Sequence, residues 1–292
     1  MFLRKDLVCL VLTLLAIVPT SNGRAASDGN NGGGTIPLLI KSRVPLTPDV
    51  AASIGSRAVH VAYVWPEINA MAVTVNPSRI AELAADPLVE LVEADQQGQA
   101  PGRNPDGEDG AAAPAVLVPL PESSSSLQAW NQDMSDTPGS GFDGTGVTVA
   151  VVDSGLPQNW EEFLPPGCVD LEHAAGFGAE GWGDFHSQLH AIRGVGGHVG
   201  LFPHGLAVSS VITGFPSELG PIGGAAPGVK ILPVRVLNQF NFGWFSWFTA
   251  GILHVGRLKA DGSLPGPVVI NFSIQASGNS AILTSAIDYA IS

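Results

Sequence analysis

The chain has 292 residues, of which 45% are hydrophobic and 13% are charged, a composition typical of folded domains and not of disordered or fibrous chains. The length suits one domain of ordinary size together with a smaller one. The 26 acidic residues outnumber the 13 basic ones and give a formal net charge of -13. Nucleic acids and anionic membrane surfaces would repel such a chain, so neither is expected as a partner.

The first 23 residues have the pattern of a secretory signal peptide. An apolar run from Leu7 to Val18 follows Arg4 and Lys5, and small and polar residues come after it. This run is short for a membrane span, so we expect cleavage and export instead of anchoring. The mature protein is therefore predicted to be secreted and extracellular, with no membrane association after residues 1–23 are removed.

The chain contains two cysteines, and Cys9 falls within the predicted signal peptide. Cys168 would stand alone after cleavage, so no disulfide within the mature chain is expected and the fold must depend on its hydrophobic core. We assign Cys168 no functional role.

Residues 36–95 have the pattern of a small α+β domain. Alternating apolar and β-branched residues predict four strands, at 36–41, 58–65, 68–75 and 89–95. Two helices are predicted, one at 46–55 and one after Asn76 and Pro77, where Asn would cap the helix and Pro would occupy its first turn. The resulting order, β-α-β-β-α-β, is the ferredoxin-like arrangement.

Residues 96–126 are rich in Gly, Pro, Ala and Ser and show no sustained period, which is typical of a linker. A protease-accessible linker between a small domain and a larger one suggests a precursor that is cut there.

Strands and helices alternate in the remaining part, residues 127–292. Apolar runs predict strands at 146–153, 230–237 and 267–273, and helical spacing predicts helices at 204–213, 244–258 and 279–292. The alternation favours an α/β domain built on a parallel sheet with helices on both faces. Because the pattern breaks off at Ser292 in mid-alternation, we expect this domain to be incomplete here.

Asp153 and His204 are the first candidates for catalysis. Asp153 ends the strand 146–153, and functional groups gather at the carboxyl ends of strands in open α/β sheets. A buried carboxylate needs a partner, which His204 could supply from the start of its helix. The alternative is that Asp153 caps a turn and His204 is an ordinary surface histidine. The residues alone leave both interpretations open.

Five segments resemble, in the same order, motifs of the subtilisin-like serine proteases (subtilases): GTGVTVAVVDSGL, PHGLAVSSVITG, GAAPGVKILPVRVLN, FSWFTAGI and VVINFS. The small domain resembles the propeptide of this family, most clearly in AVTVNPSRIAELAADPLVELVEAD. The resemblance covers most of residues 36–292. It implies a secreted serine endopeptidase precursor that acts on peptides or proteins, and whose own propeptide assists folding and blocks the cleft until the linker is cut.

The resemblance also implies roles for particular residues. Asp153 matches the aspartate of the catalytic triad, and His204 matches the histidine that takes the proton of the nucleophile. Six further residues match the two edges that hold an extended substrate backbone. They are Asn241, Phe242 and Gly243 on one edge and Ser273, Ile274 and Gln275 on the other.

Five positions depart from the family pattern. Leu206 and Ala207 stand where the family has Thr and His, Ser209 and Ser210 where it favours Ala and Gly, and Gln275 where it has Gly. We expect the Gln275 side chain to narrow the selectivity of the cleft or to weaken it.

The nucleophilic serine of the family, in a Gly-Thr-Ser context, and its asparagine oxyanion donor both follow the helix that residues 279–292 resemble. Neither is found in the chain, and Gly278-Asn279 precedes that helix and is interpreted as a loop. The resemblance therefore predicts a chain truncated before the serine and inactive as written. The alternative is a non-catalytic truncated homologue that acts as a protease inhibitor, folding chaperone or binding protein.

Two further patterns are typical of cofactor sites only in part. Gly144 and Gly146 precede a strand, whereas the glycines of a dinucleotide-binding motif follow one. His186, His190 and His198 lie in a Gly-rich stretch that is typical of a solvated loop, so no metal site is predicted. Calcium sites are common in the family, but no acidic cluster identifies one here, and no cofactor is expected to be required.

Overall fold

The computed structural model describes residues 9–12, 34–101, 140–157, 159–178, 181–184, 204–218, 220–238 and 240–292. Most of the predicted signal peptide, the linker from residue 102 onward and the histidines His186, His190 and His198 lie outside the described residues.

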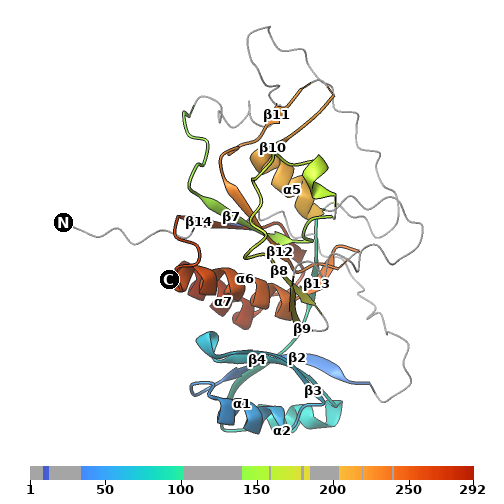
Figure 1. The fold of residues 1–292 in the computed structure, drawn as a ribbon. Coiled ribbons are helices and arrows are strands. Elements are labelled where there is room, and N and C mark those ends of the chain that lie inside the picture. Colours follow the sequence, from blue (N-terminus) through green and yellow to red (C-terminus); the bar gives the residue numbers. More distant parts are fainter. Residues whose placement is uncertain are drawn as a thin grey trace, which may run out of the picture.

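The small unit is a four-stranded antiparallel sheet of order β3-β4-β2-β5. Its strands are β2 (Ile36–Ser42), β3 (His60–Trp65), β4 (Ala70–Val75) and β5 (Val89–Ala94). Its helices are α1 (Pro48–Gly55) and α2 (Ile80–Ala84), with short 3-10 turns η1 (Pro66–Ile68) and η2 (Pro77–Arg79). Both helices lie on one face of the sheet (Figure 1), which confirms the predicted ferredoxin-like arrangement.

The two faces of this sheet are both buried. Met71, Val73 and Val75 pack with α1 and α2, as their alternation predicts. The intervening Ala70 and Ala72 are also buried, at 0% and 2% exposure, because the second face packs against the larger unit. Leu39, Tyr63 and Trp65 belong to the same cluster, so the small unit packs here through both large and small side chains.

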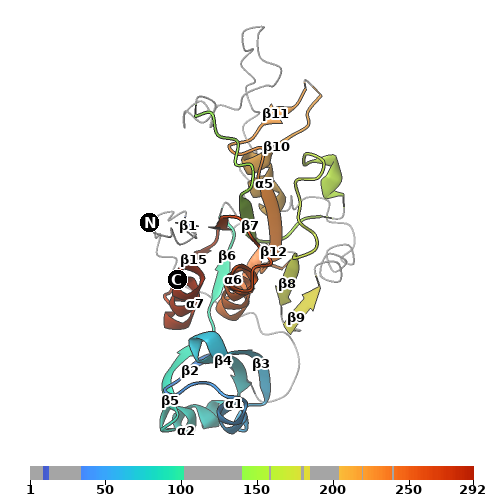
Figure 2. The ribbon, with the colours of Figure 1, turned by 60° about the vertical axis from the view of Figure 1, so that its left-hand side comes forward.

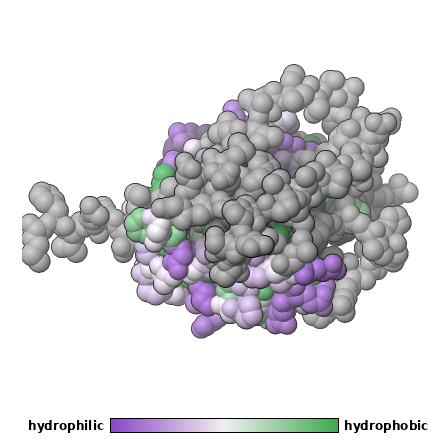
Figure 3. Space-filling view, turned by 90° about the horizontal axis from the view of Figure 1, so that it is seen from above, coloured by the Kyte–Doolittle hydropathy of each residue, from purple (hydrophilic) through white to green (hydrophobic). Residues whose placement is uncertain are grey.

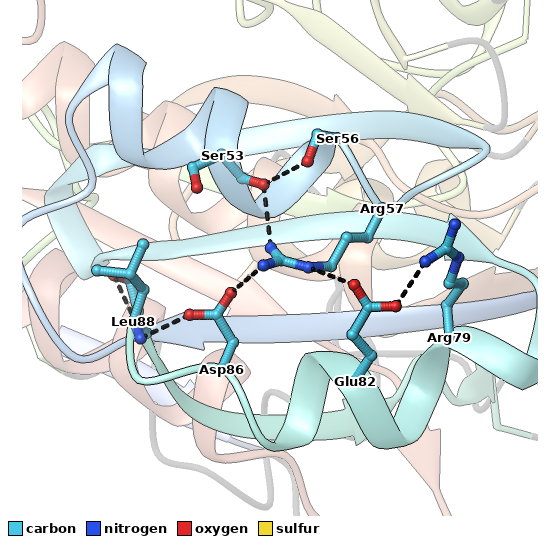
Figure 4. Close-up of polar contacts among 8 residues, drawn as sticks. Ser53, Ser56, Arg57, Arg79, Glu82, Asp86 and Leu88 are labelled. Atoms are coloured by element: carbon cyan, nitrogen blue, oxygen red, sulfur yellow. Dashed lines mark hydrogen bonds and ion pairs between the residues drawn. The ribbon is translucent and has the colours of Figure 1, made fainter.

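A charged network ties α1 to α2 on the outer side of the small unit (Figure 4). Arg57 donates to Glu82 at 3.1 Å, to the Ser53 carbonyl at 3.1 Å and to Asp86 at 2.7 Å. Asp86 also accepts a hydrogen bond from the Leu88 amide at 2.8 Å. The guanidinium therefore links the end of α1 to α2, through Glu82, and to the turn that follows α2, through Asp86.

The larger unit is built on a sheet of order β1-β14-β7-β12-β8-β9. Its strands are β1 (Cys9–Leu12), β7 (Thr148–Asp153), β8 (Ala175–Gly178), β9 (Gly181–Asp184), β12 (Lys230–Arg235) and β14 (Val268–Phe272). All neighbours are parallel except β8 and β9. The parallel α/β domain predicted from the sequence is confirmed.

Helices cover the two faces of this sheet, with α5 (His204–Thr213) on one and α6 (Phe245–Ala260) and α7 (Ala281–Ile291) on the other (Figure 2). The residues of β7 alternate accordingly. Val149 and Val151 pack on the α5 side, whereas Ala150 and Val152 pack with α6 and α7. This sandwich fixes the carboxyl end of β7 between the two helical layers.

Residues 9–12, which fall within the predicted signal peptide, form β1 and pair in parallel with β14. Smaller elements of the larger unit are the turn η4 (Trp160–Glu162) and the short antiparallel pair β10 (Gly214–Phe215) and β11 (Ile222–Gly223). Among the described residues, no helix combines the length and apolar character needed to cross a membrane. Seen from the α5 end, the visible described residues are mostly hydrophilic or intermediate, with hydrophobic ones scattered between them (Figure 3).

A third sheet joins the two units. In it β6 (Gln97–Gln99) lies between β13 (Phe242–Trp244) and β15 (Gln275–Ala276), antiparallel to both. Residues 97–99 were expected to belong to the linker, and at this point the structure differs from that expectation. Their composition is that of a linker, but they form a strand because their backbone pairs with β13 and β15 of the larger unit. The local sequence gives no sign of this pairing.

Candidate active site

The side chains of Asp153 and His204 meet at the carboxyl end of β7. Asp153 is the last residue of the strand and is fully buried, and His204 is the first residue of α5. The Nδ1 atom of His204 lies 2.8 Å from Oδ2 and 3.0 Å from Oδ1 of Asp153. With Nδ1–H donating to the carboxylate, Nε2 is left as the basic nitrogen of the ring.

Local backbone features hold α5 close to the end of β7. Gly155 adopts a positive φ of 75°, which turns the chain sharply after the strand. A Cβ atom on Gly205 would lie 2.6 Å from the Gly155 carbonyl oxygen, so only glycine fits at this crossing. The Gly205 amide donates to Ser154 Oγ at 2.9 Å. The start of α5 is thus fixed against the turn that follows Asp153.

The aspartate is positioned by its own neighbours as well. The Ser154 amide donates to Asp153 Oδ1 at 2.6 Å. The Asp153 carbonyl accepts from the amides of Val236 and Leu237, which follow β12. These contacts satisfy a buried acidic residue and leave its carboxylate directed to the imidazole.

The hydrogen bond to Asp153 raises the pKa of His204 above its ordinary value, and partial burial opposes the increase. The carboxylate therefore stabilises the imidazolium form, which a general base must pass through when it accepts a proton.

The predicted substrate edges flank β6. Phe242 and Gly243 lie opposite Gln99 and Gly98, and the Asn241 carbonyl accepts from the Ala100 amide at 3.0 Å. On the other side Gln275 lies opposite Gln99.

Two of the predicted edge residues, Ser273 and Ile274, precede β15 and do not pair with β6. Ser273 instead donates to Asn271 Oδ1 at 3.0 Å, and Ile274 packs against the main core. The backbone of Gln275 pairs in register with Gln99, and the effect of its side chain on selectivity stays a prediction.

The edges β13 and β15, with β6 between them, form what we call the groove, and one segment connects it to the Asp-His pair. The segment that leaves β12 contacts Asp153 through Val236 and Leu237, and then turns at Asn238. The Asn238 amide donates to the Phe242 carbonyl at 2.7 Å, which begins the β13 edge. The edge that holds β6 is thereby linked by a few residues to the buried aspartate.

Two acidic residues of β5 and its extension cap helices of the larger unit, a feature that the sequence analysis missed. Glu93 accepts from the hydroxyl of Ser280 and from the amides of Ala281 and Ile282 at the start of α7. Asp95 accepts from the Ser246 amide at the start of α6, at 3.0 Å. Side-chain carboxyl oxygens at helix N-termini are favourable because they accept hydrogen bonds from free N–H groups, and a negative charge there is attracted to the positive end of the helix dipole. Their alternation in VELVEAD was the available signal.

Leu206, one of the departures at the start of α5, is accommodated by packing. Leu206 is 1% exposed and packs with Leu156, Leu164 and Cys168 beneath the helix. Burial raises the pKa of the Cys168 thiol, which favours its unreactive form. The described part of the chain holds no group of three or more His, Cys, Asp or Glu side chains arranged to bind a metal ion.

Comparison with known proteins shows which proteins the chain is similar to. No protein-family model matches the chain. The chain is 24% identical to Subtilisin E of Bacillus subtilis strain 168 over 226 residues, which are 77% of this chain and 47% of that protein. It matches Subtilisin J of Geobacillus stearothermophilus with the same identity and the same coverage. The chain spans about half the length of these curated relatives.

Two solved structures share the fold. Fervidolysin from Fervidobacterium pennivorans, a keratinolytic enzyme related to subtilisin, matches with a TM-score of 0.54 and 18% identity, over 98% of this chain and 40% of that one. The epidermin leader peptide processing serine protease of Staphylococcus aureus matches with a TM-score of 0.53 and 15% identity, over 88% and 57%. The fold is subtilisin-like, and the resemblance to subtilisin-like serine proteases that the motifs predicted is confirmed.

Proposed function

We propose that the protein is the precursor of a secreted serine endopeptidase of the subtilisin type, with Asp153 and His204 as two members of its catalytic triad. The contact between His204 Nδ1 and the buried Asp153 carboxylate is the observation that supports this most strongly. In the proposed reaction His204 takes the proton of a serine hydroxyl as its oxygen attacks the peptide carbonyl, and then gives the proton to the leaving amine. Asp153 holds the ring in the tautomer that leaves Nε2 basic.

The serine itself is not assigned to any residue of the chain. Its Gly-Thr-Ser context does not occur among the 292 residues. We therefore expect these residues alone to hydrolyse no peptide, since the members of the triad act as a unit.

Substrates are proposed to be peptides or proteins that bind as an extended strand. The pairing of β6 with β13 and β15 supports this mode, because an extended strand fits between these two edges. Main-chain hydrogen bonds to both edges give this mode its affinity.

The small unit is proposed to be an inhibitory propeptide. Besides the caps of Glu93 and Asp95, it contacts the larger unit through a bidentate ion pair of Glu67 with Arg257, at 2.5 and 3.0 Å. The Tyr63 hydroxyl donates to the Gly178 carbonyl at 2.8 Å. These contacts hold β6 in the groove. If the fragment 34–101, added to the processed protease, failed to slow peptide hydrolysis, the inhibitory role would be rejected.

Labelling with a fluorophosphonate tests the catalytic proposal. This reagent forms a bond from a serine oxygen to phosphorus with loss of fluoride, and reacts quickly only with a serine that a neighbouring base activates. In the longest form that the gene encodes we expect stoichiometric labelling after removal of the small unit, and none in His204→Ala. Absence of labelling in the wild type would instead favour the non-catalytic alternative.

A further inference from the structure

The middle residue of β6, Gly98, lies against the ring of Phe248. The neighbouring Gln97 side chain is exposed and that of Gln99 is half-buried, whereas Gly98 is buried, as the two-residue alternation of a strand requires. A Cβ atom on Gly98 would lie 2.8 Å from Phe248 Cε2 and 3.0 Å from the Gln275 carbonyl oxygen. Any side chain at this position would therefore overlap with the groove.

The Phe248 ring has little freedom to move away. It is 1% exposed, and its centroid lies 5.4 Å from that of Phe272 and 6.0 Å from that of Phe245. On the opposite side of the ladder a Cβ on Gly243 would lie 2.5 Å from Phe248 Cε1. The ring thus fills the space beneath two glycines, Gly98 and Gly243, that face each other in the β6–β13 pair.

We propose that the groove selects glycine at the position that Gly98 occupies, and that Phe248 determines this selectivity. The ligands are extended peptides with glycine opposite Gly243 and with unrestricted side chains at the exposed neighbouring position. The inference rests on the proposed function, because it takes β6 as the stand-in for a peptide substrate. Close packing makes even one added methyl group costly at such a contact.

Hydrogen exchange measured on the full 292-residue chain tests the proposal in place. Exchange of the peptide covering 96–101 reports pairing of β6 with its two edges. In Gly98→Leu we expect the amides of this peptide to exchange at least about tenfold faster than in the wild type, because β6 loses its pairing with the two edges. The amides of β7 and β14 should keep their protection. Gln97→Leu is the matched control, since it adds the same side chain one residue away on the exposed face, and should leave exchange unchanged.

A second variant pair identifies the ring as the cause. Gly98→Ala alone should loosen the 96–101 peptide, and combining it with Phe248→Leu should restore protection because the smaller side chain gives room for the methyl group. Equal protection of Gly98→Leu and the wild type, or equal loosening by Gln97→Leu, would overturn the proposal. Should Phe248→Leu unfold the chain, the comparison of Gly98→Ala with Gln97→Ala decides the question.

Peptides added in trans extend the test to ligands. To the Gly98→Leu chain, whose own strand is displaced, we would add the peptide Asp-Gln-Gln-Gly-Gln-Ala-Pro or the same peptide with leucine in place of its glycine. The glycine peptide should restore protection of β13 and β15, and restoration by the leucine peptide would overturn the selectivity. Neither result depends on catalysis. A labelled, active protein that tolerates leucine at position 98 would reject this inference alone, and an unlabelled protein that shows the glycine preference would reject the peptidase proposal alone.

Discussion

The carboxylate of Asp95 accepts a hydrogen bond from the Ser246 amide, 3.0 Å away, at the first turn of α6. The contact joins the end of the small unit to the helix that supports the groove. Burial raises the pKa of Asp95 to about 6, with a further contribution from the nearby charge of Glu93, while the hydrogen bonds to Ser246 lower it. A cap that loses its proton near neutral pH makes the docking of the small unit sensitive to pH.

The sign of this effect follows from the raised pKa. The folded state holds the Asp95 proton more tightly than the unfolded chain does, so the contribution to stability is present below about pH 4 and is lost as the pH rises to about 6. Asp95→Asn keeps an oxygen acceptor for the Ser246 amide but cannot ionise. We expect its free energy of unfolding, relative to the wild type, to increase between pH 4 and pH 6 and to stay constant above. Urea unfolding at a series of pH values measures this, and a pH-independent difference would contradict it.

The imidazole of His204 should titrate above its ordinary value because its Nδ1–H donates to Asp153. In Asp153→Asn the neutral amide no longer stabilises the imidazolium, so the pKa of His204 should fall. Since the folded-state pKa is raised, the pair stabilises the fold most below the ordinary pKa of histidine, and this contribution is lost as the pH rises through the folded-state value. NMR titration of the His204 ring measures this pKa in the wild type and in Asp153→Asn. An identical pKa in the two would mean that the carboxylate does not act on the ring.

Gly205→Ala should separate the same two side chains without changing either of them. Its Cβ would lie 2.6 Å from the Gly155 carbonyl, a backbone atom that cannot move independently, so α5 must shift away from β7. We expect the pKa of His204 to fall towards its ordinary value, as in Asp153→Asn. Ala207→Gly, two residues further along α5, serves as the control for a general weakening of the helix. If Gly205→Ala left the titration of His204 unchanged, the close crossing would have no role in the pairing.

Arg57 should stabilise the small unit more than its exposed neighbour Arg79 does. Its partner Asp86 has only 4% of its side chain exposed, and Arg57→Met would leave this carboxylate without its guanidinium. We expect the free energy of unfolding to fall by about 2 kcal/mol, less than for a fully buried pair because Arg57 is itself partly exposed. Arg79→Met removes an ion pair whose side chains are about half exposed and should cost no more than about 0.5 kcal/mol. Equal losses in the two variants would contradict this assignment.

The sequence was sufficient to predict the elements whose burial pattern is local. The alternation in β4 and the continuous apolar run of β7 follow directly from the faces that these strands bury. The pairing of Asp153 with His204 was open from the residues alone and was inferred through the family resemblance. The two side chains do lie within hydrogen-bond distance, and their catalytic roles stay a prediction.

What could not be predicted depends on contacts between the two units. Gln97–Gln99 has the composition of a linker and becomes a strand only because β13 and β15 offer unpaired edges on both sides. The helix caps formed by Glu93 and Asp95 could be predicted only if it were known that α6 and α7 begin next to the small unit. Gly98 and Phe248 are in contact although they lie 150 positions apart in the sequence, and no local sequence pattern predicts this contact.

Peptide hydrolysis tests the central claim most directly. The longest encoded form, freed of its small unit, would be assayed with an extended fluorogenic peptide, together with Asp153→Asn and His204→Ala and with the 292 residues alone. We expect kcat to fall about 10⁴-fold in Asp153→Asn and about 10⁶-fold in His204→Ala, with no turnover by the 292 residues. Activity within tenfold of the wild type in both variants would show that Asp153 and His204 are not the catalytic pair.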